Sequence, residues 1–189
     1  MKPNSILTAV AQIDFLSLLW LFLIAFVVHE AEEWNITRFE RRNFVGVTPT
    51  ITERNARMWI RIVCVVGLVW CVAATLPGNP VAAAYLFLPA IALACGNALQ
   101  HVFWTFYFRQ YAPGVITAVS LLIPTGCYVA VRAVRQGYVP LWYAALLAVL
   151  IVPPLVHTVR AGNEMTPPIR AIYALGNWFS ERVLSNRQP

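Results

Sequence analysis

Charged side chains are scarce in this 189-residue chain. Lys, Arg, Asp and Glu together make up 12% of the residues, whereas hydrophobic residues make up 59%. A soluble domain carries about 25% charged residues, because its surface must interact with water. The charge present here is too little to cover such a surface, so lipid is the better solvent for most of the chain. The composition therefore predicts an integral membrane protein.

Acidic residues are outnumbered by basic ones, which gives a formal net charge of +6. The arginines lie between apolar runs and form no single basic face, so the charge indicates membrane topology and no nucleic-acid partner. Cysteine is sparse as well, and no CxxC pair occurs among Cys64, Cys71, Cys95 and Cys127. That excludes zinc ribbons and thioredoxin-like motifs, and it leaves the cysteines as small buried hydrophobic residues.

Long apolar runs make up most of the sequence. A membrane-spanning helix needs about 20 mainly apolar residues. Five stretches meet this requirement, near residues 14–33, 58–76, 81–108, 113–134 and 138–159. An earlier start of the first span, at Ile6, is the alternative. An amphipathic pattern near 168–186 predicts a helix on the membrane surface. The predicted fold class is all-α, a polytopic bundle of about five transmembrane helices plus this C-terminal interfacial helix, in one domain over residues 1–189.

The arginines set the expected orientation. The loop after the first span holds the largest group of them, namely Arg38, Arg41, Arg42, Arg54 and Arg57. Placing this loop in the cytoplasm follows the positive-inside rule, although Arg132 and Arg135 then lie outside. The N-terminus is expected outside and the C-terminus in the cytoplasm, in a bacterial inner (plasma) membrane. No small-x-small cleavage site follows the first apolar run, so we expect it to remain as a signal anchor.

The three histidines, His29, His101 and His157, fall in the first, third and fifth predicted spans. Odd-numbered spans run in the same direction across the membrane. Each histidine lies roughly 15–20 residues after its span begins, which is about 22–30 Å along a helix. The sequence therefore predicts that all three imidazoles reach a similar depth, near the cytoplasmic end of the bundle.

Carboxyl and amide groups accompany these histidines at helical spacing. Glu32 and Glu33 lie three and four residues after His29, and Asn97 lies four residues before His101, so each set shares a helix face. Unpaired carboxylates inside a membrane are costly, and a metal ion would offset that cost. Imidazole nitrogen and carboxylate oxygen are ligands that zinc accepts in a tetrahedral set. The pattern favours a divalent metal site, with zinc first and iron as the alternative.

These residues resemble a known pattern. His29-x-x-Glu32-Glu33, then Asn97-x-x-x-His101, then His157 resemble the HXXEE-motif family of uncharacterised bacterial and archaeal integral membrane proteins. The resemblance implies a metal-binding, enzymatic site built from these residues. Glu30 adds a carboxyl group beside His29 and gives a string similar to the zincin helix, but we rank it behind Glu32 as a base.

Three hypotheses follow. In the first, the protein is a metal-dependent hydrolase that acts on a lipid-like or membrane-borne substrate at the cytoplasmic leaflet. Its expected metal ligands are His29, Glu33, His101 and His157, with Glu32 as general base and Asn97 as the group that orients a ligand or substrate. In the second, a binding or transport protein uses the same ion without catalysis. In the third, the histidines only pack inside a structural membrane protein.

Overall fold

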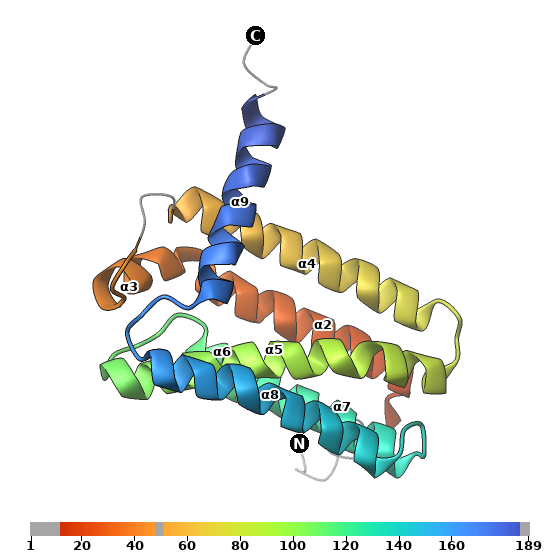
Figure 1. The fold of residues 1–189 in the computed structure, drawn as a ribbon. Coiled ribbons are helices and arrows are strands. Elements are labelled where there is room, and N and C mark those ends of the chain that lie inside the picture. The colour runs from red at the N-terminus through yellow and green to blue at the C-terminus, as the bar shows by residue number, and fades with distance from the viewer. Residues whose placement is uncertain (1–11, 48–50, 186–189) are drawn as a thin grey trace, which may run out of the picture.

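A computed structural model describes residues 12–47 and 51–185 of the chain. Five of its helices are long and apolar enough to cross a membrane. They lie side by side in one bundle, with α9 running across one end (Figure 1). The prediction of an all-α polytopic membrane protein is confirmed.

The first span consists of α2 (Phe15–Glu32), the 3₁₀ turn η1 (Glu33–Asn35) and α3 (Ile36–Asn43). Asp14 is the N-cap of α2, and its carboxylate accepts a hydrogen bond from the Ser17 backbone N–H at 2.9 Å. The alternative start at Ile6 lies outside the described residues. The 3₁₀ turn begins at Glu33, the last residue of the His29–Glu33 string, so the span bends at that point.

The second and third spans are α4 (Glu53–Thr75) and α5 (Pro80–Phe108). α4 begins at Glu53 rather than near Met58, because the Thr52 hydroxyl caps it by accepting from the Asn55 N–H. A polar first turn thus precedes the apolar run that hydropathy detects. Asn79 caps α5, whose first residue is Pro80, as is common at helix starts.

The fourth span is divided into α6 (Val115–Thr117), the π-helical turn η2 (Ala118–Leu122) and α7 (Ile123–Arg135). The π turn immediately precedes Pro124, which has no N–H to donate and so disturbs the regular ladder. The fifth span is α8 (Leu141–Ala161), and the tail forms α9 (Pro167–Ser185). A helix is thus present where the interfacial helix was expected, and its position on the membrane surface stays a prediction.

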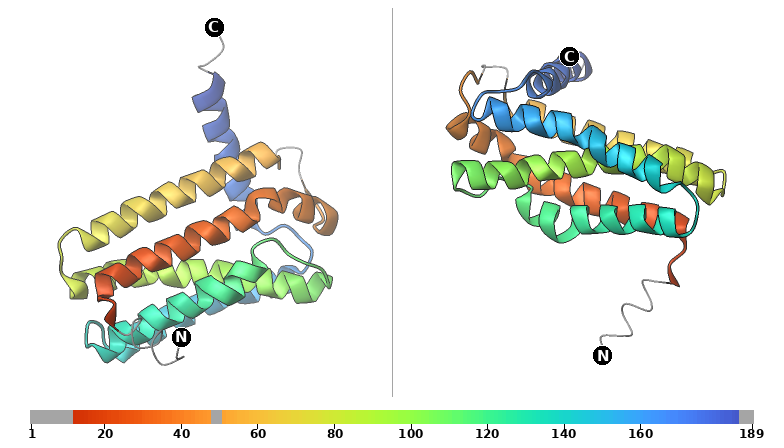
Figure 2. Two further views of the ribbon diagram at one scale, coloured as in Figure 1. Left: turned by 180° about the vertical axis from the view of Figure 1, so that it is seen from behind. Right: turned by 60° about the horizontal axis from the view of Figure 1, so that its bottom comes forward.

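α2 lies inside the bundle and contacts α4, α5 and α7. Figure 2 shows it among these helices from two further directions. α8 packs mainly against α5, and its apolar window is the least buried of the five spans. α9 packs on α4, where Gly176 lies so close that an added Cβ would be 2.6 Å from the Asn55 carbonyl oxygen. Residues on α2 are therefore the ones that the fold encloses from several sides.

The contact between α7 and α5 gives a first prediction. A Cβ added at Gly126 would lie 2.6 Å from the Cys95 sulfur and 3.2 Å from the Phe22 ring. Gly126→Leu is therefore expected to destabilise the bundle by about 1–3 kcal/mol through overpacking. Val131→Leu on the exposed face of the same helix is the matched control. Equal thermal unfolding temperatures of the two variants in detergent would contradict this packing.

Candidate metal centre

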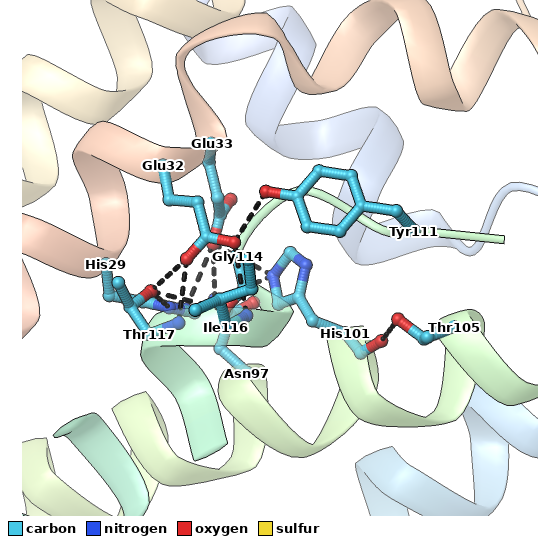
Figure 3. Close-up of polar contacts among 10 residues, drawn as sticks. All are labelled: His29, Glu32, Glu33, Asn97, His101, Thr105, Tyr111, Gly114, Ile116 and Thr117. Atoms are coloured by element: carbon cyan, nitrogen blue, oxygen red, sulfur yellow. Dashed lines mark hydrogen bonds and ion pairs between the residues drawn. The ribbon is translucent and has the colours of Figure 1, made fainter. Parts of the chain in front are cut away.

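His29, Glu33 and His101 converge at one point inside the bundle. Glu33 Oε1 lies 3.1 Å from His29 Nε2 and 2.9 Å from His101 Nε2. Among the described residues, these three form a group whose potential ligand atoms all lie within 4.8 Å of one another. The side chains come from the end of α2, from η1 and from α5, and they point toward one another in Figure 3. The helical spacing of four residues between His29 and Glu33 explains why both face α5.

A chain of hydrogen bonds links His29 to Glu32 through Thr117. The Thr117 hydroxyl donates its single hydrogen to Glu32 Oε2 at 2.5 Å, and it lies 3.0 Å from His29 Nδ1. With that hydrogen on Glu32, the hydroxyl oxygen can accept from the tautomer of His29 that carries its proton on Nδ1. In this tautomer a lone pair on Nε2 faces Glu33 Oε1 at 3.1 Å, whereas a protonated imidazole forms an ion pair with Glu33.

The side-chain amide of Asn97 contacts both Glu33 and His101. The amide nitrogen of Asn97 lies 3.3 Å from Glu33 Oε1 and 3.3 Å from His101 Nε2. An amide nitrogen only donates, and its two hydrogens serve one acceptor each. His101 Nε2 either accepts from this amide or, when protonated, donates to Glu33 Oε1 at 2.9 Å. When both imidazoles are neutral and present a lone pair at Nε2, a cation can bind between them and Glu33, at the centre of Figure 3.

The spacing of these atoms fits a metal ion. Nitrogen and oxygen ligands lie about 2.0–2.2 Å from zinc, so two ligands at the tetrahedral angle are roughly 3.3 Å apart. The observed separations of 3.1 and 2.9 Å are close to this value. The hydrogen bond from His29 Nδ1 to Thr117, which in turn donates to Glu32, matches the outer contacts that orient metal-binding histidines.

Glu32 occupies a different position from the one expected of a general base. Its Oε2 accepts from the Thr117 backbone N–H at 2.8 Å and from the Thr117 hydroxyl. Its Oε1 accepts from the Ile116 N–H at 3.1 Å and from the Tyr111 hydroxyl at 2.6 Å. Burial and the hydrogen bond with the Glu32 carboxylate raise the pKa of Tyr111 to about 12. Both oxygens are thus engaged in fastening the start of the fourth span to the first.

Gly114 closes the site from the side of the loop. Its φ of +99° lies in the left-handed region, which favours glycine. A Cβ at this position would lie 3.1 Å from His101 Nδ1 and 3.1 Å from His29 Cε1. The backbone of Gly114 therefore packs directly on the two imidazole rings, and no residue with a side chain fits there without displacing them.

His157 lies apart from the other three residues. It is exposed on α8 and lines a cavity in the bundle, and it is not a member of the close group formed by His29, Glu33 and His101. The depth argument could not decide this, because depth does not fix the direction in which a side chain points. Thr117, Tyr111 and Gly114 are site residues that the sequence analysis missed, and no short motif in the chain marks them.

The cavity has a volume of about 700 Å³ and lies between α2, α4, α5, α8 and α9. Glu33, His101 and Asn97 form part of its wall, so the convergent site opens into it. Apolar residues cover most of the remaining wall, among them Phe22, Phe26, Trp70 and Phe87. Cavities of this size and lining are typical of sites for small or lipid-like ligands.

The fold and the site define an integral membrane protein with a candidate metal centre in its helix bundle. A profile of the family described as "protein of unknown function with HXXEE motif" matches residues 20–129. The match covers more than half of the chain, so the chain belongs to this family, as its resemblance indicated. The convergent residues lie within the match and His157 lies outside it. No curated protein and no solved structure gives a match.

Two glycines with positive φ give the second prediction. Gly114 has a φ of +99° and Gly137 a φ of +71°. Replacing either glycine with alanine costs about 1–2 kcal/mol of folding free energy, because a residue with a Cβ is strained at positive φ. A Cβ at Gly137 meets nothing within 4 Å, whereas one at Gly114 meets both histidines. Gly114→Ala should therefore lower the thermal unfolding temperature more than Gly137→Ala does. Equal losses would show that the loop does not pack on the imidazoles.

Proposed function

We propose that this protein is a metal-dependent membrane enzyme, a hydrolase acting on a lipid-like substrate in the cytoplasmic leaflet. The observation that carries the proposal is the convergence of His29 Nε2, His101 Nε2 and Glu33 Oε1 at one point, where Glu33 and His101 form part of the wall of a largely apolar cavity. A through-path for ions would need charged groups along the whole depth of the membrane, whereas His29, Glu30, Glu32, Glu33 and His101 gather toward one end and the middle of the spans carries no charged residue.

His29, His101 and Glu33 would hold one divalent ion, zinc or iron. When bound, such an ion activates water and polarises a carbonyl group. Asn97 holds Glu33 and His101 in place through its amide N–H groups. It is also on the cavity wall, where it can orient a substrate carbonyl.

We assign the proton-accepting role to Glu30 in place of Glu32. Glu30 is only 6% exposed, lines the cavity with Glu33, and has no hydrogen-bond partner among the described residues. In its ionised form, such a carboxyl group can take a proton from an attacking water. Glu32 acts as a positioning residue, because its two oxygens hold Thr117 and through it the His29 ring.

The orientation belongs to the same proposal. α3 carries Arg38, Arg41 and Arg42 and follows the site directly in the chain. At the start of α4, the guanidinium groups of Arg57 and Arg61 lie 5.3 and 5.2 Å from the centroid of the Trp34 ring. With this basic end in the cytoplasm, the N-terminus is outside and the C-terminus inside, in a bacterial inner membrane, and the substrate enters from the cytoplasmic leaflet.

The third prediction concerns metal content. Purified protein should contain about one zinc or iron ion per chain, and His29→Ala or His101→Ala should remove it, because each loses one of three ligands. His157→Ala is the matched control and should retain the ion. Elemental analysis of the detergent-purified variants measures this. Loss of the ion in His157→Ala alone, or no ion in the folded parent protein, would contradict the assignment.

The fourth prediction separates chemistry from metal binding. Glu30→Gln should keep the ion but lower the turnover of lipid-like esters or amides by about 10²–10⁴-fold, as loss of a general base does. Glu32→Gln should lower thermal stability, since the amide nitrogen cannot accept the hydrogen bonds that both carboxylate oxygens accept. If Glu30→Gln hydrolyses substrate at the parental rate while Glu32→Gln is inactive but fully stable, the two roles are reversed.

A further inference from the structure

The wall of the cavity changes from apolar to acidic along the first span. Phe22 and Phe26 lie at one end, Glu30 and Glu33 follow, and Glu40 lies furthest along the chain. From Phe22 to Glu33 the distance is about 16 Å at the helical rise. Opposite the phenylalanines, α4 contributes Gly67 and Trp70. The cavity thus has an elongated apolar part and a separate polar part, with the candidate metal centre between them.

The polar part carries carboxyl groups without a Lys or Arg among the described residues. Glu30, Glu33 and Glu40 line it, and none of the described residues that line the cavity is Lys or Arg. Two arginines of α3 have partners outside the cavity. Arg38 pairs with Glu53 at 3.2 Å, and Arg41 donates to the Ile51 carbonyl at 2.6 Å.

Two of these carboxyl groups are left over after the metal centre is accounted for. Glu40 is 4% exposed and accepts a hydrogen bond from the Tyr173 hydroxyl of α9. Glu30 is 6% exposed and has no hydrogen-bond partner among the described residues. Carboxyl groups within a membrane protein are costly unless a cation or several donors accompany them. Among the described residues, no Lys or Arg lines the polar end of the cavity to accompany these carboxyl groups.

We propose that the cavity binds a single-chain amphiphile with a primary ammonium head, whose apolar chain lies along Phe22, Phe26 and Trp70. The ammonium group lies at the carboxyl group of Glu40, where it donates hydrogen bonds and neutralises charge. A phosphate head would face three carboxyl groups without a basic residue and is rejected. The volume of about 700 Å³ suits one chain. The inference rests on the proposed function in that the same cavity delivers the substrate to the metal centre.

Binding can be measured without turnover. Trp59, Trp70 and Trp104 line the cavity, so a chain-brominated amphiphile that enters it quenches tryptophan fluorescence by contact. Three probes with the same brominated chain and different heads, a primary amine, an alcohol and a monoalkyl phosphate, are titrated into the full chain in uncharged detergent. Saturable quenching by the amine should occur at a concentration at least about tenfold lower than for the phosphate.

Two pairs of variants locate the head and the chain. Glu40→Gln should remove the preference for the amine and spare binding of the alcohol, since the amide oxygen still accepts from Tyr173. Glu164→Gln, an exposed carboxyl group, is its control. Gly67→Phe should abolish saturable quenching, because a Cβ at Gly67 already lies 3.3 Å from Leu23. Val69→Phe, on the exposed face of α4, should not.

The outcomes separate this inference from the proposed function. Equal or tighter binding of the phosphate probe, no saturable quenching by any probe, or an amine preference that survives Glu40→Gln would each overturn the inference. Metal content in the same samples tests the other proposal. Selective amine binding in a protein that holds no metal would overturn the proposed hydrolase and leave the amphiphile site standing.

Discussion

The Glu33 carboxylate is the group around which the rest of the site is arranged. It lies within the first membrane span, is 8% exposed, and faces two imidazole nitrogens and an amide nitrogen. Breaking a buried ion pair by removing one partner costs about 3–5 kcal/mol, because a charge is left without compensation. The chain meets this constraint with His29 from the first span and His101 and Asn97 from the third, so the site cannot form until these spans have packed together.

That constraint explains features of the fold that helix packing alone does not require. α2 must lie inside the bundle, since its His29 and Glu33 need α5 on one side and the fourth span on another. The loop before the fourth span must approach the imidazoles closely, which requires glycine at position 114. The start of the fourth span must present free N–H groups to Glu32, and these are the groups that a helix leaves unpaired at its beginning. The same contacts thus stabilise the bundle and orient His29.

The sequence predicted the parts of this arrangement that depend on one helix at a time. Hydropathy located five spans, and a spacing of four residues correctly paired His29 with Glu33 and Asn97 with His101 on common faces. The sequence could not predict the contacts between helices. The depth of His157 could be inferred from its position along a parallel span, but the direction of its side chain depends on how α8 rotates against α5. The partners of Glu32 depend on a loop conformation that no periodicity encodes.

The helical geometry of the motif then accounts for the separate roles of its acidic residues. Successive residues of an α-helix are rotated by about 100°, so Glu32 and Glu33 point in different directions although they are adjacent. Glu33 faces α5 and the imidazoles, whereas Glu32 faces the start of the fourth span. Glu30 is three residues before Glu33 and so lies about 60° from it, which places both on the wall of the cavity. About one helical turn therefore supplies three carboxyl groups with different roles. Glu32 forms hydrogen bonds to a neighbouring span, Glu33 is a candidate metal ligand, and Glu30 faces the cavity. Moving one of these carboxyl groups to a neighbouring position would remove its contact, because the direction of each side chain is set by its place in the turn.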